Sequence, residues 1–332
     1  MRMQNQPLLV FFQRYWHITL VIVAALFSMF GGACRAADTV AVLLSERGGY
    51  HTEYLDALNH ALAESPASAK TLRLIELPVG RERPDDAALA GVSAIVTVGV
   101  PAMRNAAAWD KWENMPPVLN VLVPRASYEK LIAESSRTRN RTQFSAIYLD
   151  QPLIRQINLI RQALPGKQRV AAVVGPDSSA LLPRLRSVIA RSDLGIVTEE
   201  VASEPDILPA LSRLLPVSDV LLALPDSIVF TRDTARSVLL ATYRYQKPLI
   251  GFSQAYVNAG ALAAVFSTPS QIARQTLLLL QKLPAGRSVL PTPAYPAYFS
   301  VAVNRSVARS LALEVASDAA LLTAMTAMAE VE

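Results

Sequence analysis

Gly251-Phe252-Ser253-Gln254-Ala255 is the stretch whose residue types come nearest to a catalytic motif. It differs by one residue from the G-x-S-x-G nucleophile elbow, in which a strand-to-helix turn exposes a reactive serine. A hydrolase of that type needs a histidine after the serine, whereas His17, His51 and His60 all precede Ser253. We therefore interpret Ser253 as a loop serine that caps a helix or meets a ligand, with a serine hydrolase as the alternative.

Metal and nucleotide chemistry have weaker support. His51 and His60 are nine residues apart, so they lack the i, i+4 spacing of a helical metal site, and we expect both to be solvated. No G-x-G-x-x-G follows a strand, and no Walker A sequence is present. These observations predict no metal, no cofactor and no enzymatic activity.

Short polar segments follow several of the predicted strands. Some of them precede helices, so their side chains could simply be N-caps. Taken together, these polar groups are expected to converge from two lobes, with helix N-termini behind them. This arrangement predicts a cleft that binds an anion or a zwitterion. The predicted ligand-binding residues are Ser45, Glu46, Val100, Pro101, Arg125, Asp177, Ser178, Asp226, Ser227, Ser253 and Gln254.

The elements that must position these residues alternate between strand and helix. Leu221 to Leu224 and Leu249 to Phe252 are apolar strands that bracket one helix, which predicts a βαβ unit with parallel strands. In open α/β sheets, ligands bind at the carboxyl edge of such strands. Further strands are predicted at 39–44, 72–77, 94–98, 118–123, 144–149, 169–174, 196–201, 261–266 and 299–303, with helices between most of them and a short helix at 86–89.

The strand–helix alternation runs twice, with a break at Leu149-Asp150. Asp150 is the predicted N-cap of the helix that opens the second half, and Pro152 lies in its first turn. A chain of 332 residues has room for two such domains. The predicted fold class is α/β, with two Rossmann-like lobes, each built on a parallel sheet.

The N-terminus has the pattern of a secretory signal peptide. Basic residues precede the apolar stretch from Ile18 to Phe30, and small residues follow it, which predicts cleavage after Ala36. An uncleaved anchor is one alternative, and a lipid anchor at Cys34 is another. Removal of residues 1–36 takes away three arginines and no acid, so the net charge falls from +5 to +2. This charge is too low to predict nucleic acid as a partner.

The chain resembles the ABC-transporter substrate-binding proteins of the tryptophan/tyrosine-binding type, which have the type I periplasmic binding protein fold. The resemblance covers nearly all of residues 38–313, and its motifs are specific in combination rather than singly. They are AIVTVGVP (94–101), FSAIYLDQP (144–152), LPGKQRVAAVVG (164–175), LLALPDSIV (221–229), KPLIGFSQAYVNAG (247–260) and VAVNRSVA (301–308).

The resemblance implies a periplasmic protein that closes two lobes on a small solute and delivers it to an ABC permease and its ATPase in the inner membrane. It implies an N-terminal lobe of residues 38–148 and about 269–286, a second lobe of 149–268 and about 295–313, and a tail at 314–332. Hinges are expected at Asp150 and Thr268 of a three-segment connection. The resemblance also implies ligand contacts at all the predicted ligand-binding residues except Arg125.

Two departures from the family bear on the solute. The family usually has an Asp-Pro pair after its fourth strand, whereas this chain has Val123-Pro124 followed by Arg125. An Asp/Asn-Thr-rich loop of the family is replaced here by residues 226–229. An added cation and a lost carboxylate predict a more acidic ligand than an aromatic amino acid. The alternative function is a binding-fold protein that acts as a sensor or envelope-protein partner without transport.

Overall fold

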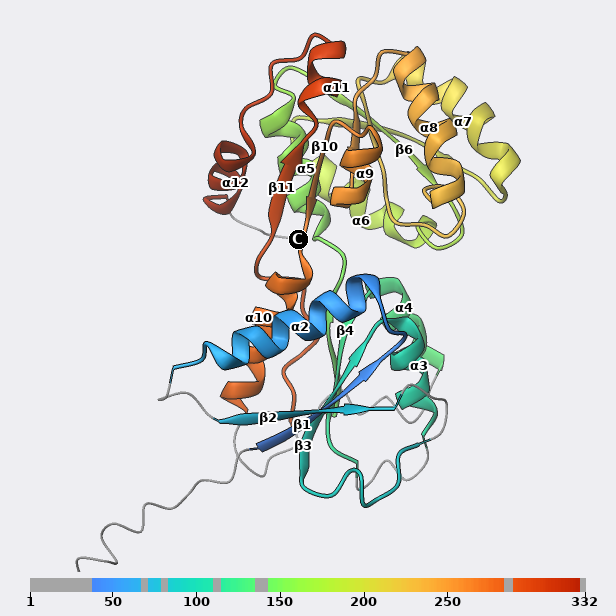
Figure 1. The fold of residues 1–332 in the computed structure, drawn as a ribbon. Helices are drawn as coiled ribbons and strands as arrows, with labels where there is room; N and C mark the ends of the chain where they lie inside the picture. Colours follow the sequence, from blue (N-terminus) through green and yellow to red (C-terminus); the bar gives the residue numbers. More distant parts are fainter. Residues whose placement is uncertain are drawn as a thin grey trace, which may run out of the picture. The chain divides into compact units, whose positions relative to one another are not determined.

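The computed structural model describes residues 38–66, 71–78, 83–109, 115–134, 143–283 and 289–328. Two separate sheets with helices around them form what we call the first lobe and the second lobe (Figure 1). This arrangement confirms the predicted α/β class. The predicted signal peptide, its cleavage site after Ala36 and Cys34 lie outside the described residues.

The first lobe is built on a parallel sheet of five strands in the order β2-β1-β3-β4-β5. Its inner strands are apolar almost throughout, because helices cover both faces of a parallel sheet. Residues 86–89, where a short helix was predicted, form turns instead. The strands are β1 Asp38–Leu44, β2 Leu72–Leu77, β3 Val92–Val98, β4 Val118–Val123 and β5 Phe144–Tyr148, and the helices are α2 Gly49–Ala63, α3 Val100–Ala108 and α4 Arg125–Glu134.

Two later segments of the chain return to the first lobe. Helix α10 (Pro269–Lys282) lies against α2, and Ile272 and Leu280 are buried in the same core as β1 (Figure 1). Ala294 then lies beside β5, where its carbonyl accepts from the Tyr148 N–H at 2.9 Å and its N–H donates to the Ala146 carbonyl at 2.9 Å. The segment around Ala294 therefore extends the first sheet by one short parallel pairing.

The second lobe has six strands in the order β11-β10-β9-β8-β6-β7. Strands β8 and β9 are parallel and α8 connects them, as the βαβ pattern predicted. The strands are β6 Arg169–Val174, β7 Gly195–Glu200, β8 Val220–Leu222, β9 Leu249–Gly251, β10 Ala263–Phe266 and β11 Ser300–Val303. The helices are α5 Leu153–Ala163, α6 Leu182–Ala190, α7 Ile207–Leu214, α8 Arg232–Arg244, α9 Gln254–Ala259 and α11 Arg305–Ser310.

Strand β11 is antiparallel to β10, which the sequence did not indicate. The chain leaves the second lobe just after Phe266 and returns to it through the segment that ends at Ser300. Phe266 and Ser300 are paired across the two strands, so the chain re-enters the sheet beside the point at which it left. A strand that starts there has to run in the opposite direction.

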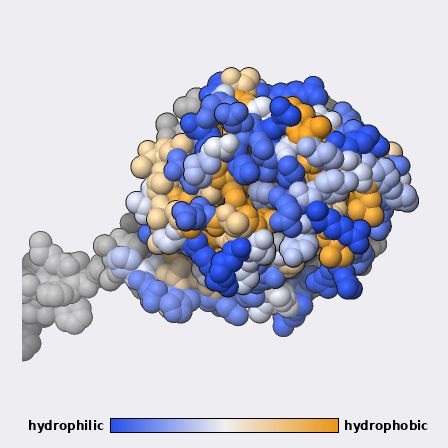
Figure 2. All heavy atoms as spheres, turned by 90° about the horizontal axis from the view of Figure 1, so that it is seen from above, coloured by the Kyte–Doolittle hydropathy of each residue, from blue (hydrophilic) through white to orange (hydrophobic). Residues whose placement is uncertain are grey.

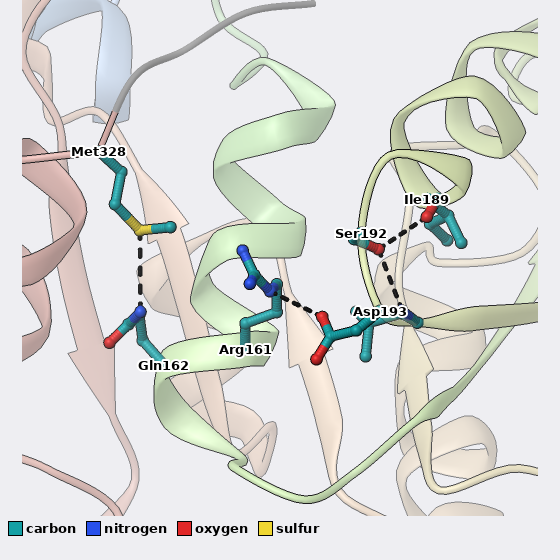
Figure 3. Close-up of polar contacts among 7 residues, drawn as sticks. Arg161, Gln162, Ile189, Ser192, Asp193 and Met328 are labelled. Carbon is teal, nitrogen blue, oxygen red and sulfur yellow. Dashed lines mark hydrogen bonds and ion pairs between the residues drawn. The ribbon is translucent and has the colours of Figure 1, made fainter.

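Residues 314–332, predicted to be a tail, contain a further helix, α12 (Asp318–Thr326). Leu321 and Met325 of α12 are 2 % exposed and belong to the core that includes α5. After the helix, the Met328 sulfur accepts from the Gln162 amide at 3.8 Å (Figure 3). The tail assignment is therefore corrected, because the described part of this segment completes the second lobe.

A buried polar network joins the three segments that connect the lobes. The Gln151 amide donates to the Ser267 hydroxyl at 2.8 Å, and that hydroxyl donates to the Tyr298 carbonyl at 2.6 Å. The Arg155 guanidinium donates to the Gln151 side-chain oxygen at 2.6 Å and to the Pro296 carbonyl at 3.0 Å. One network thus contacts each connecting segment close to the predicted hinges.

In the described part of the chain, no helix is long and apolar enough to cross a bilayer. On the face drawn in Figure 2, apolar patches are separated by hydrophilic side chains, which is the ordinary pattern of a protein surface.

Candidate functional site

The predicted site residues lie at the carboxyl edges of the two sheets. In the first lobe they follow β1, β3 and β4, and in the second lobe they follow β6, β8 and β9. The structure therefore brings together three loops on each sheet, as expected for parallel strands. Three surface pockets among the described residues, of about 450, 610 and 540 Å³, are lined by residues other than those predicted for the site.

Asp226 is the centre of a closed hydrogen-bond network in the second lobe. One carboxylate oxygen accepts from the Ser178 hydroxyl at 2.7 Å, the Ser178 N–H at 2.9 Å and the Asp177 N–H at 3.2 Å. The other accepts from the N–H groups of Ile228 at 2.9 Å and Val229 at 3.2 Å. Five donors occupy the carboxylate, so Asp226 holds the loops after β6 and β8 together.

The electrostatics of Asp226 follow from these donors. Partial burial raises the pKa of the carboxyl, but the hydrogen bonds from Ile228, Ser178 and Val229 outweigh burial and lower that pKa below its usual range. Gly175 faces the same carboxylate so closely that a Cβ atom there would overlap it. The site therefore keeps Asp226 ionised and requires glycine at position 175.

The hydroxyls of Ser45 and Ser253 are also used within the protein. Ser45 donates to the Val98 carbonyl at 2.7 Å and accepts from the Ala102 N–H at 3.0 Å, which secures the start of α3. Ser253 accepts from the Tyr256 N–H at 3.2 Å and is the N-cap of α9. Both described histidines lie on α2 of the first lobe, which leaves the hydrolase reading of Ser253 without structural support.

The other predicted residues are more accessible. Glu46, Pro101, Asp177, Ser227 and Gln254 are exposed, and Val100 is partly exposed. Gln254 donates to the Asn258 side chain at 2.9 Å. Among the described residues, the Asp177 carboxylate accepts no hydrogen bond, so Asp177 is the second-lobe charge best placed to meet a solute.

His51 is a candidate that the sequence reasoning missed. We expected it to be solvated, but its side chain is only 20 % exposed, and Nδ1 lies 3.6 Å from the Glu46 carboxylate. A Cβ atom at Gly99 would lie 2.6 Å from His51 Nε2 and 2.6 Å from Ser45 Oγ, and Gly99 has a φ of +89°. His51 therefore packs over the turn between β3 and α3. Only the tertiary structure reveals this position of the His51 side chain.

Asp150 does not cap α5, whose N-cap is Pro152. Its carboxylate instead accepts from the Arg125 N–H at the start of α4. The N-cap prediction was wrong because β4 and β5 are neighbours, so the end of β5 lies next to the helix that follows β4. Burial raises the pKa of the Asp150 carboxyl above its usual value, although the Arg125 N–H works against this shift.

We expect Asp150→Asn to raise the free energy of unfolding at pH 7 and to have a smaller effect at pH 4. A raised native pKa means that the folded state disfavours the carboxylate, so stability falls as the pH rises through that pKa. Asparagine keeps an oxygen for the Arg125 N–H and removes the charge. Urea unfolding at pH 4 and pH 7 measures the effect; a loss of stability at pH 7 would contradict it.

Metal ligation has no support in the described residues, where no three acids, histidines or cysteines gather. The arrangement instead offers hydrogen-bonding loops at two sheet edges, with a cation at Arg125 and carboxylates at Glu46 and Asp177. Such a set can orient a small polar solute.

Comparison with protein families decides what kind of protein this is. The family model described as ABC transporter substrate binding protein matches residues 128–327, well over half of the chain. The chain belongs to this family. Its members are binding proteins that supply a small molecule to an ABC transporter, and this family suggests a location outside the cytoplasm. No curated protein sequence is significantly similar to the chain.

Solved structures share the fold of this substrate-binding protein at low sequence identity. A ligand-free, open substrate-binding protein with adhesive properties from Clostridium difficile has a TM-score of 0.63 at 12% identity, and the match covers 85% of this chain and 97% of that one. An ABC domain in complex with L-Trp from Streptococcus pneumoniae has a TM-score of 0.56 at 14% identity, with 87% and 98% covered. A conserved domain protein from Vibrio cholerae has a TM-score of 0.56 at 17% identity, with 86% and 98% covered.

Proposed function

We propose that the chain is the periplasmic solute-binding component of an ABC importer. It holds a small polar or zwitterionic solute between its lobes and delivers it to a permease and its ATPase in the inner membrane. The supporting observation is that exposed polar loops follow the strands of both sheets, while a few connecting segments join the lobes. Such connections suit hinge closure around a ligand.

The proposed cellular route begins at the N-terminus. A signal peptide exports the chain and is removed after Ala36, so the mature protein is free in the periplasm. Lipid attachment at Cys34 is the alternative, which intact mass measurement of the mature protein distinguishes. The tryptophan/tyrosine-binding type stays a prediction, and L-Trp and L-Tyr belong among the solutes tested.

The test is a melting-temperature series on the mature chain, refolded to remove any bound solute. The panel contains amino acids, peptides, nucleobases, sugars and organic acids. A solute at 100 times its Kd should stabilise the folded state by about 2.7 kcal/mol, which corresponds to a shift of about 5–11 °C at about 2–4 °C per kcal/mol. A reproducible shift for one chemical class supports the proposal. A flat panel would contradict it and favour a sensor or envelope-protein partner.

A further inference from the structure

The side chain of Arg125 is held between two tyrosines at the edge of the first sheet. Its guanidinium carbon lies 5.9 Å from the ring centroid of Tyr148 and 5.5 Å from that of Tyr295. The two rings meet edge to face, with centroids 5.4 Å apart. Nη1 also donates to the Tyr295 hydroxyl at 2.9 Å. We call these three residues the Arg125 stack.

The stack joins parts of the chain that are distant in sequence. Arg125 is the first residue of α4, Tyr148 is the last residue of β5, and Tyr295 belongs to the segment that pairs with β5. Since the Arg125 N–H is bound to the Asp150 carboxylate, both the backbone and the side chain of Arg125 are fixed. Such an arginine loses little conformational freedom when it binds a further group.

Glu129 is the counter-ion of the guanidinium. Nε of Arg125 donates to the Glu129 carboxylate at 2.6 Å, one turn later on α4. Burial works against the charge on Arg125, but this hydrogen bond and the electrostatic interactions with Tyr295, Glu129 and Tyr148 together outweigh burial and raise the pKa of the guanidinium. The Arg125 guanidinium therefore stays protonated at every pH at which the protein is folded. The Glu129 carboxylate offsets part of its positive charge.

The guanidinium still has donors to offer. It carries five N–H groups, of which Nε serves Glu129 and one on Nη1 serves Tyr295. Nη2 donates to no other residue in the described ranges, and the side chain is 25% exposed at the carboxyl edge of β4. Two N–H groups on neighbouring nitrogens of a planar guanidinium match the two oxygens of a carboxylate.

We propose that Arg125 binds a carboxylate of the solute, so that the solute is an organic acid or a zwitterion rather than a neutral sugar or a cation. This inference rests on the proposed function and names the solute class for the same site. The Glu129 carboxylate offsets the charge of the guanidinium and repels a second carboxylate, so it lowers the affinity for the solute. Tyr148 and Tyr295 act as positioning residues, since they orient Arg125.

The test uses matched pairs of probes on the mature chain: benzoate and benzamide, succinate and succinamide, L-phenylalanine and L-phenylalaninamide, with ribose and myo-inositol as neutral polyols. Calorimetry should show binding of the carboxylate in at least one pair and at least tenfold weaker binding of its amide. Arg125→Gln should weaken that binding about 30-fold or more. Glu129→Gln should tighten it, because the negative charge that offsets the guanidinium is gone.

Arg161→Gln is the matched control, because Arg161 belongs to α5 of the second lobe and forms an ion pair with Asp193 at 3.0 Å (Figure 3). It should bind as the unmodified protein does, and circular dichroism should show all three variants folded. Equal binding of acid and amide, or Arg125→Gln affinity within twofold of the unmodified protein, would overturn the inference. Binding of a polyol alone would overturn it and leave the proposed function standing, whereas binding of no probe would count against both.

Discussion

Replacing Asp226 with asparagine is expected to lower the free energy of unfolding by about 3 kcal/mol or more. Each carboxylate oxygen accepts at least two hydrogen bonds, so whichever oxygen becomes an amide nitrogen will face at least two N–H donors. The loops after β6 and β8 then lose the group that joins them. Urea unfolding followed by circular dichroism measures the loss.

Asp177→Asn is the control for this prediction, because it removes a carboxylate that is exposed and one residue from Ser178. It should change stability by no more than about 0.5 kcal/mol. An equal loss in both variants would contradict the network as described.

The pH dependence of Asp226 gives a second readout. The pKa of its carboxyl is lowered in the folded protein, so its contribution to stability is present above the ordinary aspartate pKa of about 3.9 and is lost as the pH falls through the lowered value. The difference in stability between the unmodified protein and Asp226→Asn should therefore shrink below about pH 4. A difference that stays constant down to pH 2 would mean that the ionised carboxylate is not the stabilising group.

A comparable loss is expected in the first lobe when Asn120 is replaced by leucine. Asn120 is fully buried in β4, where its oxygen accepts from the Thr97 hydroxyl at 2.6 Å and its nitrogen donates to the Ser145 carbonyl at 2.7 Å. Leucine leaves the buried Thr97 hydroxyl without its acceptor, which costs about 2–3 kcal/mol. Thermal and urea unfolding measure the change.

A second substitution, Thr97→Val, tests whether the contact between Thr97 and Asn120 is responsible for the loss. In the unmodified protein it should cost about 1 kcal/mol, because it removes one partner of a satisfied pair. In the Asn120→Leu background it should cost nothing or restore stability, because it removes the unsatisfied hydroxyl. Simple addition of the two single losses would show that the contact between Thr97 and Asn120 is not what stabilises this sheet.

The sequence alone was sufficient to predict the α/β fold class and most of its strands. Continuous apolar runs such as residues 170–174 are buried on both faces of a sheet, and helices between such strands favour parallel pairing. These patterns are local in the sequence, so they do not depend on which distant residues contact the strand in the folded protein. The predicted loops lie at the strand ends for the same reason.

What each loop residue does was decided only by the tertiary structure. Asp226 looked like a ligand group, yet it is saturated by donors from the loop after β6, 48 and 49 residues earlier. Asp150 looked like the cap of its own helix, yet it holds the start of α4, 25 residues earlier. Arg125 meets Tyr295 across 170 residues. A hydrogen-bonding side chain takes the nearest partner in space, and strand order in the sheets determines which residues are near.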